Sequence, residues 1–435
     1  MFKTLKYKYT PTKKERRLLR LLCHISKNLY NSALYTLRQE YFKTKKLLSY
    51  YELNKILKTN ENFHILNTYT SICIIKNVYT IFSNFIKGYT NLPKYLKQND
   101  YYQLYTEQIR PIYNNDSLCI KLPLSNLTRT SKTFNKVFED ELINSFIKES
   151  DIKEAFNIYF KIPKIISNKN IRQLRIIPSF KGLSYNIIFT YIDTLKTTNK
   201  TINDDNLIMA IDLGINNLAT CVITNNESFI IDGRYLKSIN HFYNKKLAYL
   251  QSKKPNNNIY TIMEHKVTEK RNRRIKDAIY KVAKQIIVYS IKNNISEIVI
   301  GYNKGFKTYG IKNNNIRNNE KRKINQNFIQ IPLSKFKERI KYLCKINGIK
   351  CTQINEAYTS ICSFYDNEEI KYHKNYQGKR ITRSLFKTKE GKVINADINA
   401  ALNILAKCKT ERTDIISILR NIGQTVPIRQ KIKFN

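Results

Sequence analysis

Residues 207–223 read LIMAIDLGINNLATCVI, and this stretch decides the fold of the second half of the chain. Its first five residues are apolar, as in a strand that is buried on both faces, and Asp212 stands where the strand ends. Gly214 follows, and its missing side chain lets the backbone approach a bulky ligand. We predict that residues 218–224 and 228–231 pair with this strand as hairpins. The stretch therefore predicts a sheet with a carboxylate at its edge.

The segments that follow complete an α/β unit. They comprise a long basic helical stretch at 236–293, a buried strand at 297–301 (EIVIG), an amphipathic helix at 333–347, a strand at 349–354 and a helix at 395–405. Three strands, a helix, a strand, a helix, a strand and a helix is the element order of a ribonuclease H-like fold. We therefore predict one such domain over 207–405.

A second carboxylate lies near the end of this unit. The sequence INADINAALNIL at 394–405 places Asp397 at the start of the last helix. Asp212 and Asp397 can converge at the carboxyl edge of one sheet, and a third carboxylate would complete a two-metal phosphodiesterase site. Mg²⁺ prefers such oxygen ligands, and two ions about 3.5–4 Å apart activate a water and stabilise the leaving oxygen. On this pattern alone, it is equally possible that Asp212 is an ordinary acid at the end of a strand and that Asp397 only caps a helix.

The first half of the chain predicts a helical domain and a small β-barrel. Residues 1–9 alternate in the manner of a strand, and Thr10-Pro11-Thr12 signals the start of a helix. We expect the helical domain at 10–95 and the barrel at 96–200, with 1–9 as its first strand and a helical run at 133–159. A polar linker at 195–206 and a basic tail at 406–435 flank the nuclease-like unit.

The composition points to a polyanionic partner. The 435 residues include 77 Lys and Arg against 33 Asp and Glu, a net charge of +44. Such an excess suits binding to many phosphates and argues against an ordinary metabolic enzyme. Its 42% apolar residues argue against disorder, and no apolar run is long enough to span a bilayer. The eight cysteines include no Cys-x-x-Cys pair, so we expect no zinc site, no disulfide framework and an intracellular, non-membrane protein.

Five motifs together resemble the TnpB/OrfB-type transposon-encoded RNA-guided nucleases, whose relatives include the Fanzor proteins and the type V CRISPR effectors. In order along the chain, they are MAIDLGINNLAT (209–220), IVIGYNKGFK (298–307), NQNFIQIP (325–332), EAYTS (356–360) and GKRITRSLF (378–386) with NADINAALNIL (395–405). The segments KYTPTKKERRLLRLL (8–22) and NLYNSAL (28–34) resemble the start of the family's recognition region. The resemblance implies a multidomain α+β protein, with a helical recognition domain and a wedge barrel before a RuvC-like nuclease domain.

Two departures from the family pattern change the predicted site. The family's usual second acid ends the fourth strand, where this chain has Gly301, and Glu297 lies at the strand's other end. Some relatives carry the acid on the neighbouring strand. Since adjacent strands lie about 4.8 Å apart, Glu356 could reach the same metals, and we predict a catalytic and metal-binding set of Asp212, Glu356 and Asp397. The zinc ribbon of the family keeps only Cys362, so the insert at 357–394 should fold without zinc or be partly mobile.

Basic residues outside this set are predicted to contact nucleic acid. Residues 265–285 hold eight Lys and Arg against two acids, which favours a helix facing nucleic acid over a solvated one. The predicted contacts are Lys13, Lys14, Arg16, Arg17, Arg271, Arg273, Arg274, Lys304, Lys307, Arg380 and Arg383. Phe306, between the last two lysines, could stack on a base.

The predicted function is RNA-guided DNA cleavage encoded by a transposable element. The resemblance implies a transposon-derived guide RNA and a double-stranded DNA target as partners, with the protein a monomer in a ribonucleoprotein. It would work in the nucleus if eukaryotic or viral and in the cytoplasm if prokaryotic; Gly301 and the reduced zinc ribbon favour the Fanzor-like branch. Two alternatives stay open: an RNA-guided DNA-binding protein that does not cut, and a junction resolvase that uses no RNA.

Overall fold

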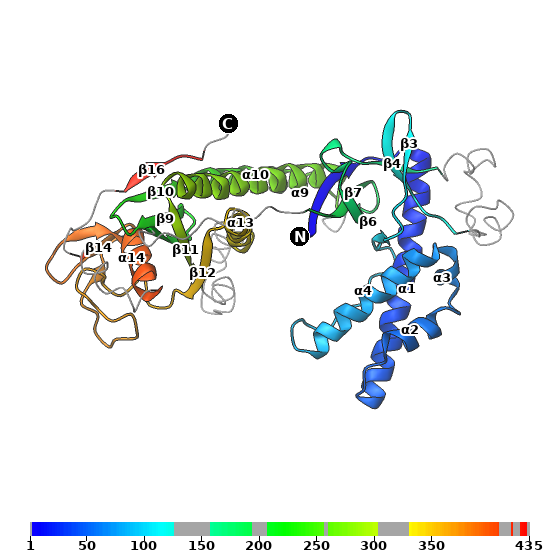
Figure 1. The fold of residues 1–435 in the computed structure, drawn as a ribbon, viewed down its shortest axis with the longest axis horizontal. Helices are drawn as coiled ribbons and strands as arrows, with labels where there is room; N and C mark the ends of the chain where they lie inside the picture. Colours follow the sequence, from blue (N-terminus) through cyan, green and yellow to red (C-terminus); the bar gives the residue numbers. More distant parts are fainter. Residues whose placement is uncertain are drawn as a thin grey trace. The chain divides into compact units, whose positions relative to one another are not determined.

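The protein is described by a computed structural model, which covers residues 2–125, 157–193, 207–255, 260–302, 330–408, 419–420 and 427–432. The chain divides into two compact units, Met1–Leu195 and Lys196–Asn435. The predicted linker at 195–206 and most of the helical run at 133–159 fall outside the described residues. Each unit is described by itself (Figure 1).

The first unit begins with a strand and a long helix, as predicted. Strand β1 (Phe2–Tyr9) precedes helix α1 (Lys13–Thr44). Thr12 caps α1, because its side chain accepts from the Glu15 amide while the Glu15 carboxylate accepts from the Thr12 amide. Three further helices follow: α2 (Tyr50–Leu57), α3 (Glu61–Ile65) and α4 (Thr68–Ile86).

The strands of the first unit form two antiparallel sheets. They are β2 (Leu104–Thr106), β3 (Pro111–Asn114), β4 (Ser117–Lys121), β5 (Tyr159–Lys161), β6 (Asn170–Ser179) and β7 (Ser184–Ile192), with a 3-10 turn η1 (Lys164–Ile166). The sheet orders are β1-β7-β6-β2 and β3-β4-β5. Strand β1 joins this later sheet, as predicted. The described strands leave both sheets open, so the closed barrel stays a prediction.

One hydrophobic core joins the helices and strands of the first unit. Leu29 on α1, Phe82 on α4 and Phe189 on β7 are all completely buried in it. Because helices and sheet share this core, residue 95 does not divide the unit into two compact parts. The predicted helical domain at 10–95 and β-barrel domain at 96–200 lie within one compact unit, and the boundary between them stays a prediction.

The second unit is built on a six-stranded sheet of order β12-β11-β8-β9-β10-β16. Its elements are β8 (Leu207–Asp212), β9 (Asn217–Ile223), β10 (Ser228–Asp232), α9 (Arg234–Ser252), α10 (Ile262–Lys292), β11 (Ile295–Tyr302), α13 (Leu333–Ile346), β12 (Lys350–Asn355), α14 (Ala396–Cys408) and β16 (Ile428–Gln430). Strands β11 and β12 run parallel to β8, whereas β9 is antiparallel to both β8 and β10. This element order is the predicted one, and the basic helical stretch is divided in two where Thr261 caps α10.

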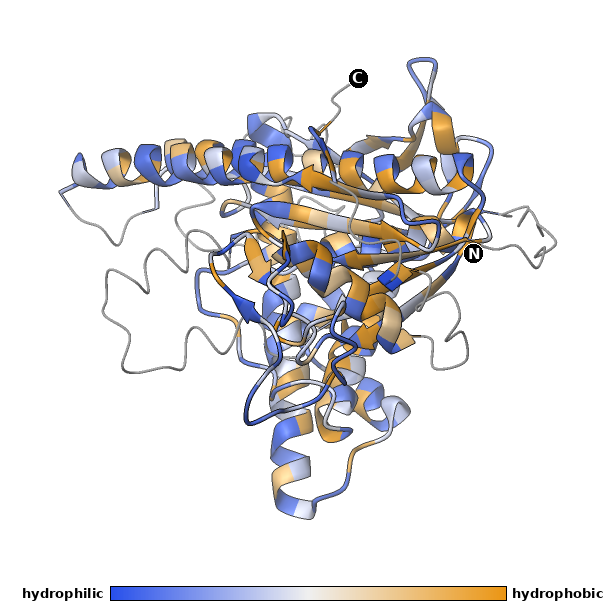
Figure 2. Cartoon of the chain, turned by 90° about the vertical axis from the view of Figure 1, so that its left-hand side faces the viewer, coloured by the Kyte–Doolittle hydropathy of each residue, from blue (hydrophilic) through white to orange (hydrophobic). Residues whose placement is uncertain are grey.

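The two faces of this sheet pack against different helices. Met209 and Ile211 of β8 point into a core with α10 and α13, whereas Ile208 and Ala210 point into a core with α14. This alternation is the two-residue period of a strand. The strands accordingly carry mostly apolar residues, as Figure 2 shows. Asp212, next in the alternation, falls on the α14 side.

Two smaller features complete the second unit. The insert at 357–394 contains a three-stranded sheet of β13 (Lys379–Arg380), β14 (Leu385–Lys387) and β15 (Val393–Asn395). Strand β16, in the segment predicted only as a basic tail, pairs in parallel with β10. Among the described helices, none has the length and hydrophobicity to cross a membrane.

Candidate active site

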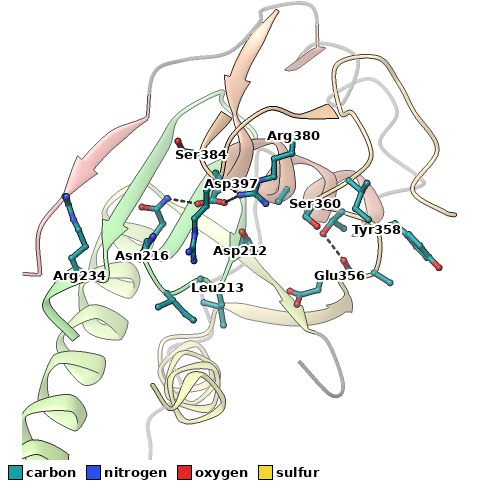
Figure 3. A pocket seen from close by; sticks show the side chains of 18 of the residues that line it. Asp212, Leu213, Asn216, Arg234, Glu356, Tyr358, Ser360, Arg380, Ser384 and Asp397 are labelled. Atoms are coloured by element: carbon teal, nitrogen blue, oxygen red, sulfur yellow. Dashed lines mark hydrogen bonds and ion pairs between the residues drawn. The ribbon is translucent and has the colours of Figure 1, made fainter. Parts of the chain in front are cut away.

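Three carboxylates line one cavity where the central strands end. Asp212 is the last residue of β8, Asp397 lies in the first turn of α14, and Glu356 directly follows β12. All three line one cavity of about 830 Å³ (Figure 3). The structure thus brings together the three predicted site residues, which come from segments far apart in the sequence.

The carboxylate of Asp397 is held from two sides. The Asn217 amide nitrogen on β9 donates to its Oδ2 at 2.6 Å. The Arg380 guanidinium in the insert contacts its Oδ1 at 3.1 Å (Figure 3). Arg380 also donates to the Arg383 carbonyl at 3.0 Å through its Nε. Asp397 is therefore oriented before any ligand binds.

Glu356 lies over Gly301, the position where the family's usual strand acid would stand. A Cβ atom placed on Gly301 would lie 2.9 Å from the Glu356 Oε2 and 3.4 Å from its Cβ. It would also lie 2.6 Å from the Cδ1 of Ile404 on α14. The side chain of Glu356 thus fills the space next to the neighbouring strand. Glu297, at the other end of β11, instead accepts from the Thr352 hydroxyl at 2.6 Å.

Burial and the two neighbouring carboxylates act on the ionisation of Asp212. Burial raises the pKa of Asp212 to about 8; Asp397 and Glu356 add to this rise, and Arg380 opposes it. Burial also raises the pKa of Glu356. Negative charge is therefore costly at this edge of the sheet without a cation.

The donor set fits a divalent cation. Carboxylate oxygens are the ligands that Mg²⁺ prefers, and a cation would offset the burial and the repulsion that together raise the pKa of Asp212. As they stand, no three His, Cys, Asp or Glu side chains in the described part of the chain are grouped closely enough to hold one ion. Asp212, Glu356 and Asp397 are the residues that would hold it.

Helix α14 also fixes the loop that follows Glu356. The Asn403 amide nitrogen donates to the carbonyls of Thr359 at 2.9 Å and Cys362 at 2.7 Å. Asn399 donates to the Cys362 carbonyl at 2.9 Å and accepts from the Phe364 amide at 3.0 Å. Both asparagines are almost completely buried. The helix that carries Asp397 therefore sets the position of the loop beside Glu356.

Replacing Asn403 with leucine should loosen this loop. Leucine has a similar size but cannot donate, so the buried Thr359 and Cys362 carbonyls lose a partner, which costs about 2 kcal/mol of unfolding free energy. We expect faster hydrogen exchange in peptides covering 359–364, measured by mass spectrometry. Lys392→Ala, which changes an exposed side chain of the same insert, is the matched control. Equal exchange in both variants would show that the asparagine does not hold the loop.

A buried carboxylate cross-links the insert at 357–394. Glu368 is 5% exposed and accepts from the amides of Ser363 at 2.7 Å and Gln377 at 2.9 Å. The Cys362 sulfur lies 3.5 Å from the Glu369 carbonyl. The contacts of Glu368 join two segments of the insert, near Ser363 and near Gln377. They support the prediction that the insert folds without zinc, which remains a prediction.

The predicted nucleic-acid contacts fall in different surroundings. Arg380 and Arg383 line the cavity with the acids. Arg273 and Arg274 are exposed on α10, whereas Arg271 donates to Asn240 at 2.8 Å and to the Gln330 carbonyl at 2.6 Å and so is held within the protein. In α1, Lys13 and Lys14 are exposed and Arg16 and Arg17 are half-buried. Lys304, Phe306 and Lys307 lie outside the described residues.

Sequence reasoning missed several polar residues of the cavity. Arg234, Lys237 and Arg429 line it. Arg429 also lies 3.6 Å from the carboxylate of Asp232. The pairing of β16 with β10 brings Arg429 to the site, and no local sequence pattern predicts that pairing.

Comparisons with known proteins agree with the motifs. Residues 192–307 match the OrfB_IS605 family, described as a probable transposase, and residues 334–404 match the Cas12f1-like TNB domain. A search of curated proteins found no match. The cryo-EM structure of a Cas12f1–sgRNA–target DNA complex is similar, with a TM-score of 0.57, 15% identity, and coverage of 90% of this chain and 83% of that chain.

A second similar structure is that of the mini RNA-guided endonuclease CRISPR-Cas_phi3, with a TM-score of 0.46, 11% identity, and coverage of 98% of this chain and 94% of that chain. At these identities the Cas12f1 structure shows a shared α+β fold. The two family matches lie in the part of the chain that carries the five motifs. By these matches, residues 192–307 and 334–404 are similar to the TnpB/OrfB-type family and to the Cas12f1-like effectors.

Proposed function

We propose that this protein is an RNA-guided DNA endonuclease that cuts target DNA next to a short adjacent motif, through a RuvC-like two-metal site. The observation that carries the proposal is the position of Glu356, whose carboxylate fills the space beside Gly301 in the cavity that Asp212 and Asp397 also line. Burying a carboxylate costs free energy, and a protein that had only lost the strand acid would not need a second carboxylate at this position. The relocated glutamate supports an active nuclease of the Fanzor-like branch.

The chemistry assigned to the site is phosphodiester hydrolysis. Bound Mg²⁺ ions would supply an activated water and stabilise the leaving oxygen. The protein's part is to present oxygen ligands from three elements and to orient them: Asn217 and Arg380 fix the carboxylate of Asp397. Arg380 and Arg383 place positive charge in the same cavity, which suits a scissile phosphate.

The remaining charge is assigned to the guide RNA and the target duplex. We propose that the first unit is the recognition and wedge region, that the insert at 357–394 is a zinc-free form of the ribbon that loads the target strand, and that one protein copy works in each particle. The exposed Arg273 and Arg274 on α10 and the exposed Lys13 and Lys14 on α1 would contact phosphates. The protein would act in the nucleus of a eukaryotic or virus-infected cell, or in the cytoplasm of a prokaryote.

RNA that co-purifies with the protein tests the guide assignment. We expect one abundant structured transcript that spans a transposon end, because a single guide scaffold must neutralise much of the +44 charge. Sequencing the RNA after purification at about 0.5 M salt, where weak non-specific contacts are lost, makes the measurement selective. A heterogeneous mixture without an enriched transcript would contradict the RNA-guided assignment.

A further inference from the structure

A second hollow adjoins the cavity that holds the three acids. It measures about 480 Å³ and is formed by the insert. Its lining residues are Ser360, Ile361, Lys374, Asn375, Tyr376, Gly378, Lys379, Arg380 and Phe386. Ser360, Ile361 and Arg380 also line the cavity of the acids, so the two hollows are contiguous.

The lining of this second hollow suits a nucleotide. It contains three cations, Lys374, Lys379 and Arg380, and no carboxylate. The aromatic rings of Tyr376 and Phe386 supply flat apolar surface. The combination of cations and aromatic rings is the one that binds the phosphates and bases of single strands.

The base of the second hollow is formed by tightly packed residues. Phe386 is almost completely buried, and a Cβ on Gly378 would lie only 2.4 Å from its Cε1 atom. A larger residue at 378 would therefore push the ring away.

The hollow keeps a fixed relation to the acids. Ser360 and Ile361 lie between Thr359 and Cys362, whose carbonyls accept from Asn403. Asn403 is on α14, the helix that carries Asp397. The second hollow and the three acids are thus held at a fixed distance, so a base bound in the hollow would belong to a nucleotide at a fixed position along the strand from the phosphate at the acids.

We propose that the hollow between Tyr376 and Arg380 binds one nucleotide of single-stranded DNA, next to the phosphate that is cut. The base packs against Tyr376 and Ile361, and its phosphate lies beside Lys379 and Arg380. This inference rests on the proposed nuclease function and adds a subsite to it. It predicts that the enzyme senses whether a base is present at one position beside the cut.

An abasic scan tests the subsite in the guide-loaded enzyme. Targets with a single abasic residue at successive positions around the cut should be cleaved equally except at one position, where cleavage slows about tenfold, in keeping with the loss of one stacked base. Tyr376→Leu should cut intact DNA about tenfold more slowly and lose the abasic effect, whereas Tyr376→Phe, which keeps the ring, should retain both. A flat scan in the wild type, or an unchanged abasic effect in Tyr376→Leu, overturns the proposal.

A second measurement needs neither guide nor cleavage, and so separates failure of the subsite from failure of the proposed function. The full-length Asp212→Asn protein is irradiated with a single-stranded oligonucleotide that contains 5-iododeoxyuridine, and the adducts are mapped by mass spectrometry. We expect adducts in residues 372–380, lost in Tyr376→Leu. Adducts elsewhere on the protein, with none in this segment, would refute the subsite even if guided cleavage is confirmed.

Discussion

Replacing Asp212 with asparagine should lower the rate of guided DNA cleavage by about 10³-fold or more, which corresponds to the several kcal/mol that metal-ion catalysis supplies. Asp212 ends the central strand and lines the cavity with Glu356 and Asp397, so its loss removes one of the three carboxylates proposed to bind the metal ions. Single-turnover cleavage of a labelled target by the guide-loaded protein gives the rate. Guide binding, measured by gel shift, should be unchanged.

The same substitution should stabilise the metal-free protein at alkaline pH. In the folded protein the pKa of Asp212 is raised to about 8, above its unfolded value of about 4. The folded state therefore holds a proton that the unfolded state releases, and stability from this group falls as the pH rises from about 4 to about 8. Asparagine cannot ionise, so that loss disappears in the variant.

Thermal melts at two pH values test the predicted direction of this change in stability. At pH 9 without divalent ions, Asp212→Asn should melt at a higher temperature than the wild type, and at pH 4 the two should melt together. Added Mg²⁺ should raise the wild-type melting temperature more than that of the variant, because an ion that binds the folded state stabilises it. A variant that melts lower than the wild type at pH 9 would show that Asp212 is not under electrostatic strain.

Removing the carboxylate of Glu356 should lower cleavage by about 100-fold or more, and returning one to the neighbouring strand should restore part of it. The first change, Glu356→Ala, removes a proposed metal ligand. It also frees the space over Gly301, where a new Cβ would lie 2.9 Å from the Glu356 Oε2. The double variant Gly301→Glu/Glu356→Ala should therefore cut about tenfold faster than Glu356→Ala alone.

The single variant Gly301→Glu is the matched control for this exchange. It places a second carboxylate against Glu356 and should lose both activity and stability, since the crowding and the repulsion remain. In the double variant only the flexible Cδ1 end of Ile404 has to move. Wild-type cleavage rates in Glu356→Ala would show that Glu356 is not the third acid.

The sequence was sufficient for the parts of the site that depend on strand order. Asp212 ends an apolar strand and Glu356 follows another, so the parallel pairing of β8, β11 and β12 brings both to the same edge of the sheet. The reach of Glu356 toward Gly301 follows from the spacing of adjacent strands. Each of these predictions rests on local pattern and on one rule of sheet geometry.

The parts that the sequence did not predict depend on contacts between distant segments. The bonds of Asn217 and Arg380 to Asp397 join β9, the insert and α14, and the motifs that contain these residues do not tell which side chains bond to one another. The boundary placed at residue 95 stays a prediction for a similar reason. Composition changes there, but the helices and strands on either side bury their apolar residues in one core, which composition cannot reveal.

The measurement that tests the account most directly is cleavage of a supercoiled plasmid carrying the target, by the protein loaded with its co-purified RNA. We predict Mg²⁺-dependent linearisation by the wild type, and none by Glu356→Gln, although both bind the target equally in a gel shift. Guided binding without cleavage by the wild type would identify an RNA-guided DNA-binding protein instead. Cleavage of branched DNA without RNA would identify a junction resolvase, and either result would contradict the central claim.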